Sequence, residues 1–505
     1  MTKYIRSSLI LLLFSSCSIL KSDIPQPQRE FRGVWVATVV NIDWPKSGKD
    51  KSDQQKADYL KILDFYKDLN FNAIIFQVRT AGDAFYPSKL SPWSRFLSGK
   101  EGEKPNWEED PLQWIIDETH KRGMEFHAWF NPYRATFDLN TEILSPDHDY
   151  FKHPEWMVKY GKKYYYDPGL PQVRQKFSNI VAEVVSKYDI DGVHLDDYFY
   201  PYKIKNEVFS DSISYYNCAL ENQSLADWRR SNIDSLVKNV NTTIKEMKPW
   251  LPFGISPFGV WKNNTTDPKG SDTKAGQTTY EDLYADPLLW MEKRWVDYMA
   301  PQVYWSMDLP VASHRKIMAW WSKNASETNL YIGNGAYKVR NNSDEAWNEK
   351  KELPEQIKLA RKTPEVTGNI LFSAKSLMNN NPDVVKYLKR NYYKFPALPP
   401  KKTFLRNTSP EPIQLVYLEK NKSRIKAIIN KDALVNSVLI YRSKKKMEAY
   451  SAKKIRKQVW IDPKDNSFII PRELIDCKRF AVTFLDPYGR ESKPIVLHLN
   501  QIPDK

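Results

Sequence analysis

The sequence predicts an α/β fold, a (β/α)8 TIM barrel followed by a small β-sandwich, and three observations support this. Eight short apolar runs each precede a stretch with helical periodicity. The runs are continuously apolar, as expected of parallel strands that are covered on both faces. After a Pro-rich break at 395–402, the helical pattern stops and short strand-like segments alternate with polar turns. A doubly wound open sheet is the alternative, but no Gly-rich phosphate turn follows any of the runs.

The expected barrel strands and helices alternate along the chain. Ser52 is expected to cap a helix that runs to Leu69, and Pro111 is expected to open a second helix that Gly123 closes. Apolar stripes at helical spacing predict two further helices, over 173–188 and 236–247. The eight expected strands are 31–40, 72–79, 125–132, 191–198, 252–259, 297–305, 329–337 and 368–375.

The C-terminal part of the chain is expected to form a β-sandwich, similar to a fibronectin type III domain, because its short strands are separated by polar turns. Its expected strands are 413–418, 425–429, 437–442, 458–461, 467–470 and 480–485. The expected organisation is a signal peptide over 1–17, a tether over 18–29, a barrel domain over 30–394, a Pro-rich linker over 395–409 and the β-sandwich domain over 410–505.

The N-terminus has the pattern of a bacterial export signal. Lys3 and Arg6 precede an apolar run over 9–14, and two serines then precede Cys17. This run is too short to span a bilayer. A cysteine after small residues resembles a lipobox, which predicts that Cys17 is lipidated and holds the protein at a membrane of the cell envelope, facing the periplasm or the exterior. Ordinary cleavage nearby, without a lipid, is the alternative.

Composition limits the classes of partner. The net charge of +15 suits an anionic polymer or a lipid surface, although a solvated basic surface is the simpler explanation. The lysines are scattered and no nucleic-acid-binding module is present, so nucleic acid is not an expected partner. Aromatic residues make up 13% of the chain, which suits either a large core or stacking on sugars. Cys218 and Cys477 lie in different expected domains, so no disulfide framework is predicted.

Alternation along the expected strands places polar side chains inside the barrel. In the fourth strand, Val193 and Leu195 share one face, whereas His194 and Asp196 share the opposite one. Polar side chains in a barrel are costly to bury unless they are partnered or solvated. The sequence therefore predicts a solvated pocket at the C-terminal strand ends, where the active sites of TIM barrels lie. By the same rule, eight further side chains are expected to point into the barrel, namely Gln77, Arg79, His127, Trp129, Asn131, Ser256, Gln302 and Tyr304.

Carboxylates are the candidates for acid–base chemistry in this pocket. Asp196 is the best single candidate, because alternation turns it inward at a strand end. Asp197 is expected to face the loops unless the strand ends there. Asp83 and Asp308, which follow the second and sixth strands, could reach the same pocket. His127, His194 and Asp196 could in principle hold a metal, but the usual His-rich spacings are absent, so no metal or other cofactor is expected.

Five ordered motifs resemble the glycosyl-hydrolase-like 10 family, which comprises bacterial envelope proteins with a TIM barrel. The motifs are Arg32-Gly-Val-Trp35, Gln77-Val-Arg79 with Asp83 and Tyr86-Pro87, Trp129-Phe-Asn-Pro-Tyr-Arg134, Asp191-Gly-Val-His-Leu-Asp-Asp-Tyr198 and Ala300-Pro-Gln-Val-Tyr-Trp305. The resemblance covers about residues 30–393 and does not reach the C-terminal β module. It implies hydrolysis of glycan strands, in some members those of peptidoglycan without stem peptides.

The fourth-strand motif also resembles the Asp-Gly-x-Asp-x-Asp-x-Glu signature of family 18 chitinases. Here His194 replaces the middle Asp, and Tyr198 stands where the catalytic Glu would be. The chitinase acid is therefore not carried over to this chain. Whether an N-acetyl group of the substrate takes part, with Asp196 orienting it, is left open.

The resulting expectation is a glycoside hydrolase that cleaves a β-linked amino-sugar polysaccharide, namely peptidoglycan glycan. Asp196 is the expected principal catalytic carboxylate, with Asp197 or Asp83 as its partner. Two alternatives are a non-catalytic glycan-binding envelope lipoprotein and a metal-dependent deacetylase or amidase on the same barrel. The expected substrate-binding residues are Arg79, Gln77, His127, Trp129, Asn131, His194, Tyr198, Gln302 and Tyr304.

Overall fold

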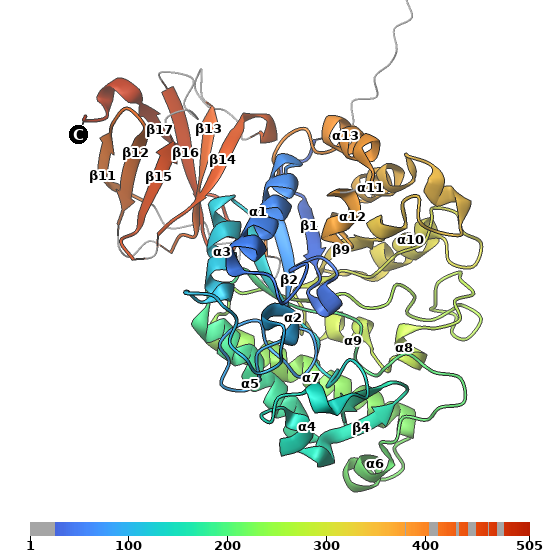
Figure 1. Cartoon of the computed structure of the whole chain (residues 1–505). Helices are drawn as coiled ribbons and strands as arrows, with labels where there is room; N and C mark the ends of the chain where they lie inside the picture. The colour runs from blue at the N-terminus through green and yellow to red at the C-terminus, as the bar shows by residue number, and fades with distance from the viewer. Residues whose placement is uncertain are drawn as a thin grey trace, which may run out of the picture.

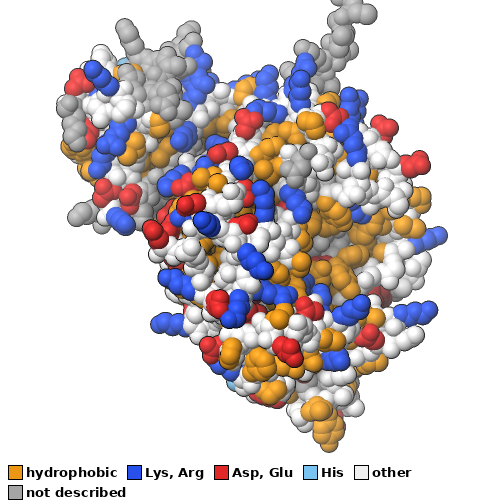
Figure 2. Space-filling view, in the orientation of Figure 1, with side chains coloured by type: hydrophobic (Ala, Val, Ile, Leu, Met, Phe, Trp, Pro, Cys, Tyr) orange, Lys and Arg blue, Asp and Glu red, His pale blue; other side chains and the backbone are white. Residues whose placement is uncertain are grey.

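The computed structural model describes residues 26–378, 380–402, 413–430, 434–442, 451–462, 464–471 and 479–504 (Figure 1). The expected signal peptide, Cys17 and Cys477 lie outside these residues. Figure 2 shows Lys and Arg side chains scattered over one face of the molecule among acidic ones, rather than gathered in one patch.

Eight parallel strands close into a barrel in the order β1-β10-β9-β8-β7-β6-β3-β2, which confirms the predicted TIM barrel. Each strand falls within or close to a predicted run, and all eight are shorter than predicted. Pro257 and Pro301, which lack an N–H group for the ladder, follow β7 and β8 within two residues. The strands are β1 Phe31–Val36, β2 Ala73–Arg79, β3 Glu125–Phe130, β6 Gly192–Leu195, β7 Phe253–Ile255, β8 Tyr298–Met299, β9 Asn329–Asn334 and β10 Val366–Leu371.

The barrel has two apolar layers, which follow from the period of two along each strand. Val193 and Leu195 of β6 belong to the large core between the strands and the helices. Phe31, Trp35 and Tyr298 belong to a separate cluster inside the barrel. The predicted inward and outward faces of β3 and β6 are thus confirmed.

Helices cover the outside of the barrel, and the four expected ones are present. Lys51 occupies the N-cap of α1 without a side-chain bond, so Ser52 is the first helical residue and not its cap. Asp110 caps α3 by accepting from the N–H groups of Leu112 and Gln113, and Gly123 follows its end at φ +70°. The helices are α1 Ser52–Asp68, α2 Arg95–Ser98, α3 Pro111–Lys121, α4 Asp149–Lys152, α5 Pro171–Lys187, α6 Ser212–Cys218, α7 Leu225–Met247, α8 Thr279–Asp282, α9 Pro287–Glu292, α10 His314–Asn324, α11 Glu352–Lys362, α12 Ala374–Met378 and α13 Pro382–Asn391.

A hairpin that the sequence pattern did not predict is inserted between β3 and α5. Its antiparallel strands are β4 Met157–Tyr160 and β5 Lys163–Tyr166. Arg134, just after β3, pairs with Tyr165 in an isolated bridge. The hairpin therefore extends the wall of the barrel beyond its C-terminal end.

The C-terminal strands form two antiparallel sheets that share one core. Ile425 and Ile470 of one sheet and Val438 and Phe484 of the other belong to a single apolar cluster, as in a sandwich. The first sheet contains β11 Leu415–Lys420, β12 Arg424–Ile429 and β15 Ser467–Pro471. The second contains β14 Ile455–Trp460, β13 Ser437–Arg442, β16 Arg479–Leu485 and β17 Ile495–His498, of which β17 was not predicted.

The β-sandwich packs against the barrel at the N-terminal ends of its strands (Figure 1). Trp460 stacks on His120 of α3 with ring centroids 4.8 Å apart. Glu125, the first residue of β3, and Asp191, just before β6, line one crevice together with Trp460. The sandwich therefore lies at the end of the barrel opposite to the predicted pocket.

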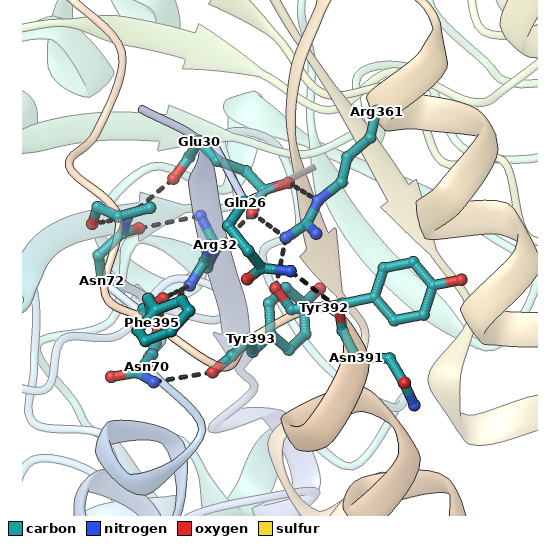
Figure 3. Close-up of polar contacts among 11 residues, drawn as sticks. Gln26, Glu30, Arg32, Asn70, Asn72, Arg361, Asn391, Tyr392, Tyr393 and Phe395 are labelled. Atoms are coloured by element: carbon teal, nitrogen blue, oxygen red, sulfur yellow. Dashed lines mark hydrogen bonds and ion pairs between the residues drawn. The ribbon is translucent and has the colours of Figure 1, made fainter. Parts of the chain in front are cut away.

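A buried ionic cluster joins the two ends of the barrel chain (Figure 3). Glu30 accepts from Arg32 Nε at 2.6 Å and from Arg361 Nε at 2.5 Å, and Arg32 Nη1 donates to the Phe395 carbonyl at 2.7 Å. Burial by itself raises the pKa of Glu30, but the two guanidinium groups outweigh it and hold this pKa below its usual value. The cluster connects β1, α11 and the segment that follows α13.

Candidate active site

A cavity of about 540 Å³ opens at the C-terminal ends of the barrel strands, where the sequence predicted a pocket. Residues on each of the eight strands, or within three positions after it, line the cavity, and loops complete its wall. Its polar and charged lining residues are Gln77, Asn131, Arg134, Lys163, Asp196, Asp197, Ser256, Gln302 and Lys338. Its aromatic lining residues are Trp35, Trp129, Phe137, Tyr198, Tyr202, Phe258, Tyr304, Trp305, Tyr337 and Phe372.

Asp196 and Asp197 both reach the cavity, although they are neighbours in sequence. Strand β6 ends at Leu195, so the strict alternation of side chains also ends there. This is the condition under which Asp197 was expected to turn inward. The two side chains are almost completely buried, at 4% and 2% exposure. Among the described residues, they are the only carboxylates that line this cavity.

A chain of side-chain amides fixes the orientation of Asp196. Its Oδ2 accepts from Asn131 Nδ2 at 2.6 Å, and Asn131 Oδ1 accepts from Gln77 Nε2 at 2.6 Å. Gln77 Oε1 accepts in turn from the backbone N–H groups of Thr38 and Val39, at 3.0 and 2.9 Å. Each amide has its oxygen and nitrogen assigned by these bonds. The predicted inward residues of β2 and β3 therefore position the carboxylate of β6.

The two aspartates hold their protons differently. Burial and the neighbouring Asp197 raise the pKa of Asp196 to about 7, against the opposing effect of Arg134. Burial also raises the pKa of Asp197, but hydrogen bonds from Tyr202 and Gln302 favour its charged form. Two carboxyl groups this close titrate as one system. Near neutral pH the pair can therefore hold one proton, with Asp196 as its main site.

A line of hydrogen bonds runs down the barrel interior below the cavity. Trp35 Nε1 donates to His194 Nε2 at 3.2 Å, so Nδ1 of His194 carries the proton and donates to the Tyr298 hydroxyl at 3.0 Å. Tyr298 then donates to His127 Nδ1 at 3.1 Å, and His127 Nε2 donates to Glu125 at 3.2 Å. Burial keeps the pKa of His194 well below its usual value, so its imidazole is neutral.

His127 and His194 were expected to bind substrate, and the structure places them elsewhere. Neither side chain lines the cavity. Both point into the barrel, as alternation predicted, but they lie deeper than the strand ends. Their hydrogen bonds with Tyr298 place them below the cavity, at the floor of the site.

Arg79 and Asp83 also lie outside the cavity lining. The register between β2 and β3 shifts between Gln77 and Arg79, and this bulge ends the alternation that was expected to turn Arg79 inward. Arg79 Nη1 instead donates to the Ser91 hydroxyl at 2.8 Å. Asp83 Oδ1 accepts from the N–H groups of Thr80 and Ala81, at 3.1 and 2.9 Å, so its carboxylate closes a local turn. Asp83 therefore lies apart from the cavity, and Asp197 is the carboxylate that lines it together with Asp196.

Several lining residues were missed because they lie on loops, which have no periodicity to indicate direction. Arg134 ends a motif that was singled out, but no role was assigned to it. Tyr202 and Lys338 follow β6 and β9 at a distance, and Lys163 lies on the hairpin that was not predicted. Of the residues expected to bind substrate, Gln77, Trp129, Asn131, Tyr198, Gln302 and Tyr304 do line the cavity.

A closed parallel barrel with a carboxylate pair in an aromatic-lined cavity at its C-terminal end is the architecture of a glycoside-hydrolase-like protein. The chain belongs to the Glycosyl hydrolase-like 10 family, whose model matches residues 30–349.

Two similar proteins, both named glycosyl hydrolases, support this family membership. Glycosyl hydrolase YngK of Bacillus subtilis is 45% identical over 404 residues, which cover 79% of this chain and 78% of YngK. Glycosyl hydrolase DigH of Escherichia coli K12 is 39% identical over 370 residues, which cover 69% of this chain and 83% of DigH.

Among solved structures, the PgaB glycoside hydrolase domain from Bordetella bronchiseptica matches at 12% identity with a TM-score of 0.48, over 72% of this chain and 99% of that one.

Proposed function

We propose that the protein is a glycoside hydrolase that cleaves a β-linked amino-sugar glycan, and that its substrate is peptidoglycan glycan without stem peptides. The observation that carries this proposal is the buried aspartate pair in the cavity, which can hold one proton near neutral pH. Glycoside hydrolysis needs such a proton for the leaving oxygen and a negative charge near the anomeric carbon. Membership of the family and the names of YngK and DigH support the same reaction class.

The two aspartates divide the chemistry in this proposal. Asp196 donates its proton to the glycosidic oxygen as the bond to the anomeric carbon breaks. The Asp197 carboxylate, held by Tyr202 and Gln302, stabilises the positive charge that develops on the sugar. The attacking oxygen can belong to water, to the N-acetyl group of the substrate or to Asp197 itself, because the second carboxylate of such a pair can act as the nucleophile. The anomer that is released first, observed by NMR, separates direct attack by water, which inverts the anomeric centre, from the other two routes, which retain it.

Aromatic side chains give the cavity a surface on which sugar rings can stack. Tyr304 stacks on Phe372 at 5.9 Å between centroids and meets Tyr337 edge-on at 5.9 Å. Trp129 and Trp305 also line the cavity. Such rings bury the apolar faces of sugars, and Gln302 lines the same cavity with an amide that can meet hydroxyl groups.

The reaction can be tested with purified protein and glycan strands from which the stem peptides have been removed. New reducing ends, measured by reductive labelling, are the expected result, and strands that retain their peptides serve as the comparison. Binding without new ends would support a non-catalytic glycan-binding protein instead. Release of acetate or of peptide, abolished by a chelator, would point to a metal-dependent deacetylase or amidase.

The pH dependence should follow the proton on Asp196. We expect kcat/KM to fall above about pH 7, because the raised pKa of Asp196 means that the group loses its proton there. Asn131→Leu removes a donor that favours the charged form of Asp196. This substitution should raise the pKa further and move the descending limb to higher pH. Rates that stay constant from about pH 6 to 9 would contradict the role of Asp196 as the acid.

The location of the protein is also a proposal. The described part of the chain has no helix that is long and apolar enough to cross a bilayer. The sequence pattern before Cys17 supports a lipid anchor in the cell envelope. Cys17→Ala should move the protein from the membrane fraction to the soluble fraction, as shown by fractionation and immunoblotting. If the variant resists extraction by carbonate as the wild type does, Cys17 is not the anchor.

A further inference from the structure

Three cationic side chains line the cavity around the aspartate pair. Arg134 follows β3, Lys163 begins β5 and Lys338 ends the 3-10 turn after β9. In the order of the barrel, β3 is next to β6 on one side, whereas β9 is three strands away on the other. Positive charge thus flanks Asp196 and Asp197 from two walls of the cavity.

The two lysines make no direct contact with a carboxylate in the described part of the chain. The amine of neither Lys163 nor Lys338 takes part in a hydrogen bond or an ion pair there. Burial lowers the pKa of Lys163, and the nearby Arg134 lowers it further. Burial also lowers the pKa of Lys338, against the opposing effect of the Asp344 carboxylate. A cation that is partly buried and repelled by its neighbour is stabilised when an anion binds beside it.

The Arg134 side chain is held in place, but part of its guanidinium has no hydrogen-bond partner in the described structure. The group lies 4.6 Å from the ring centroid of Tyr198 and 5.5 Å from that of Phe137, and it is only 6% exposed. Its Nη1 donates to the Thr80 carbonyl at 3.3 Å, and its buried Nε has no partner in the described structure. A planar guanidinium fixed between rings is suited to a second planar group, above all a carboxylate.

These cations do more than balance the aspartates. Arg134 lowers the pKa of both Asp196 and Asp197, so its charge serves the acid pair in part. Neither Lys163 nor Lys338 is among the main influences on those two groups. The positive charges of Lys163 and Lys338 are therefore available to an anionic ligand.

We propose that Arg134 and Lys163 bind a carboxylate of the glycan beside the cleaved bond, and that Lys338 makes a second contact with an anionic group across the cavity. This inference rests on the proposed function, because it takes an amino-sugar glycan as the occupant of the site. In peptidoglycan glycan, each N-acetylmuramic acid has a free lactyl carboxylate only where no stem peptide is attached, since the attachment is an amide. The cations thereby select strands from which the peptide has been removed.

The test compares two forms of one soluble glycan, the peptide-free strand and the same strand with its lactyl carboxylates converted to methylamides. Binding is measured by calorimetry with the full-length protein carrying Asp196→Asn, which prevents turnover. We expect the carboxylate form to bind about tenfold to a hundredfold more tightly, as for hydrogen bonds to charged groups. This preference should weaken as the salt concentration rises.

Lysine variants in the same background locate the effect. Lys163→Met should reduce the ratio of the two affinities by about tenfold, and Lys338→Met should reduce it in the same direction. Lys162→Met is the matched control, because Lys162 is the exposed neighbour on the same hairpin and does not line the cavity. It should leave the ratio unchanged. Thermal unfolding of each variant confirms that it is folded, and the second lysine provides the test if the first variant is unstable.

Equal or undetectable binding of the two glycan forms would overturn the inference. So would variants at Lys163 and Lys338 that both behave like Lys162→Met. Failure of the proposed function looks different: the wild-type protein would then prefer the carboxylate form in binding but would produce no new reducing ends from either form. That outcome would support the carboxylate-binding site and contradict the proposed hydrolase activity.

Discussion

Asp196→Asn should lower kcat/KM on peptide-free glycan strands by about 10²–10⁴-fold, the usual effect of losing a positioned acid or base. The amide is nearly isosteric with the carboxyl group, but it has no proton to give to the leaving oxygen. Asp197→Asn should also lower the rate, because it removes the negative charge held by Tyr202 and Gln302. Rates are measured from new reducing ends under single-turnover conditions.

Two controls separate a chemical effect from a folding effect. Asp308, which follows β8, lies outside the cavity lining and is exposed, so Asp308→Asn should leave the rate unchanged. A raised pKa means that the charged form of Asp196 is disfavoured in the folded protein, so its contribution to stability is lost as the pH rises through about 7. At pH 8, Asp196→Asn should therefore unfold at the same temperature as the wild type or at a higher one. Near-normal turnover by a folded Asp196→Asn protein would refute the assignment.

Glu30→Gln should destabilise the barrel by about 3–5 kcal/mol, the typical cost of breaking a buried ion pair from one side. The substitution leaves Arg32 and Arg361 in the buried cluster without their shared carboxylate. Denaturant unfolding followed by tryptophan fluorescence measures the change, because most of the Trp residues lie in the barrel.

An exposed ion pair provides the comparison for this prediction. Lys100 and Glu103 contact each other at 2.5 Å, but their side chains are 72% and 58% exposed. Such pairs contribute little to stability, so Glu103→Gln should change the unfolding free energy by less than about 1 kcal/mol. An unfolding midpoint for Glu30→Gln that matches the one for Glu103→Gln would show that the cluster does not hold the barrel closed.

The sequence predicted the parts of the fold that follow a regular period. Alternation assigned His194 to the inside of the barrel and Val193 to the outside, because β6 is regular up to Leu195. The same rule placed Asn131 correctly at the end of β3. It did not place Arg79, because a bulge in β2 interrupts the period after Gln77.

Alternation gives the side of a strand but not the depth along the barrel axis. His127 and Asn131 both point inward from β3 or its end, yet only Asn131 reaches the cavity, while His127 contacts Glu125 below it. Residues on loops carry no such signal at all. Lys163 lines the site because its hairpin is held beside the end of β3 by the bridge between Arg134 and Tyr165, which are distant in sequence.

The position of both acids on consecutive residues has a consequence for how such a site can diversify. One peptide unit links Asp196 to Asp197, directly after a strand that is hydrogen-bonded on both sides. The strand therefore fixes the backbone of both aspartates, and Tyr202 is the loop residue that contacts the Asp197 carboxylate. Insertions and substitutions in the hairpin, or in the turns after β7 and β9, can reshape the outer wall without disturbing the reacting groups. Related proteins can therefore differ in the residues that line the outer wall, and so in the glycan they accept, while they keep the same aspartate pair.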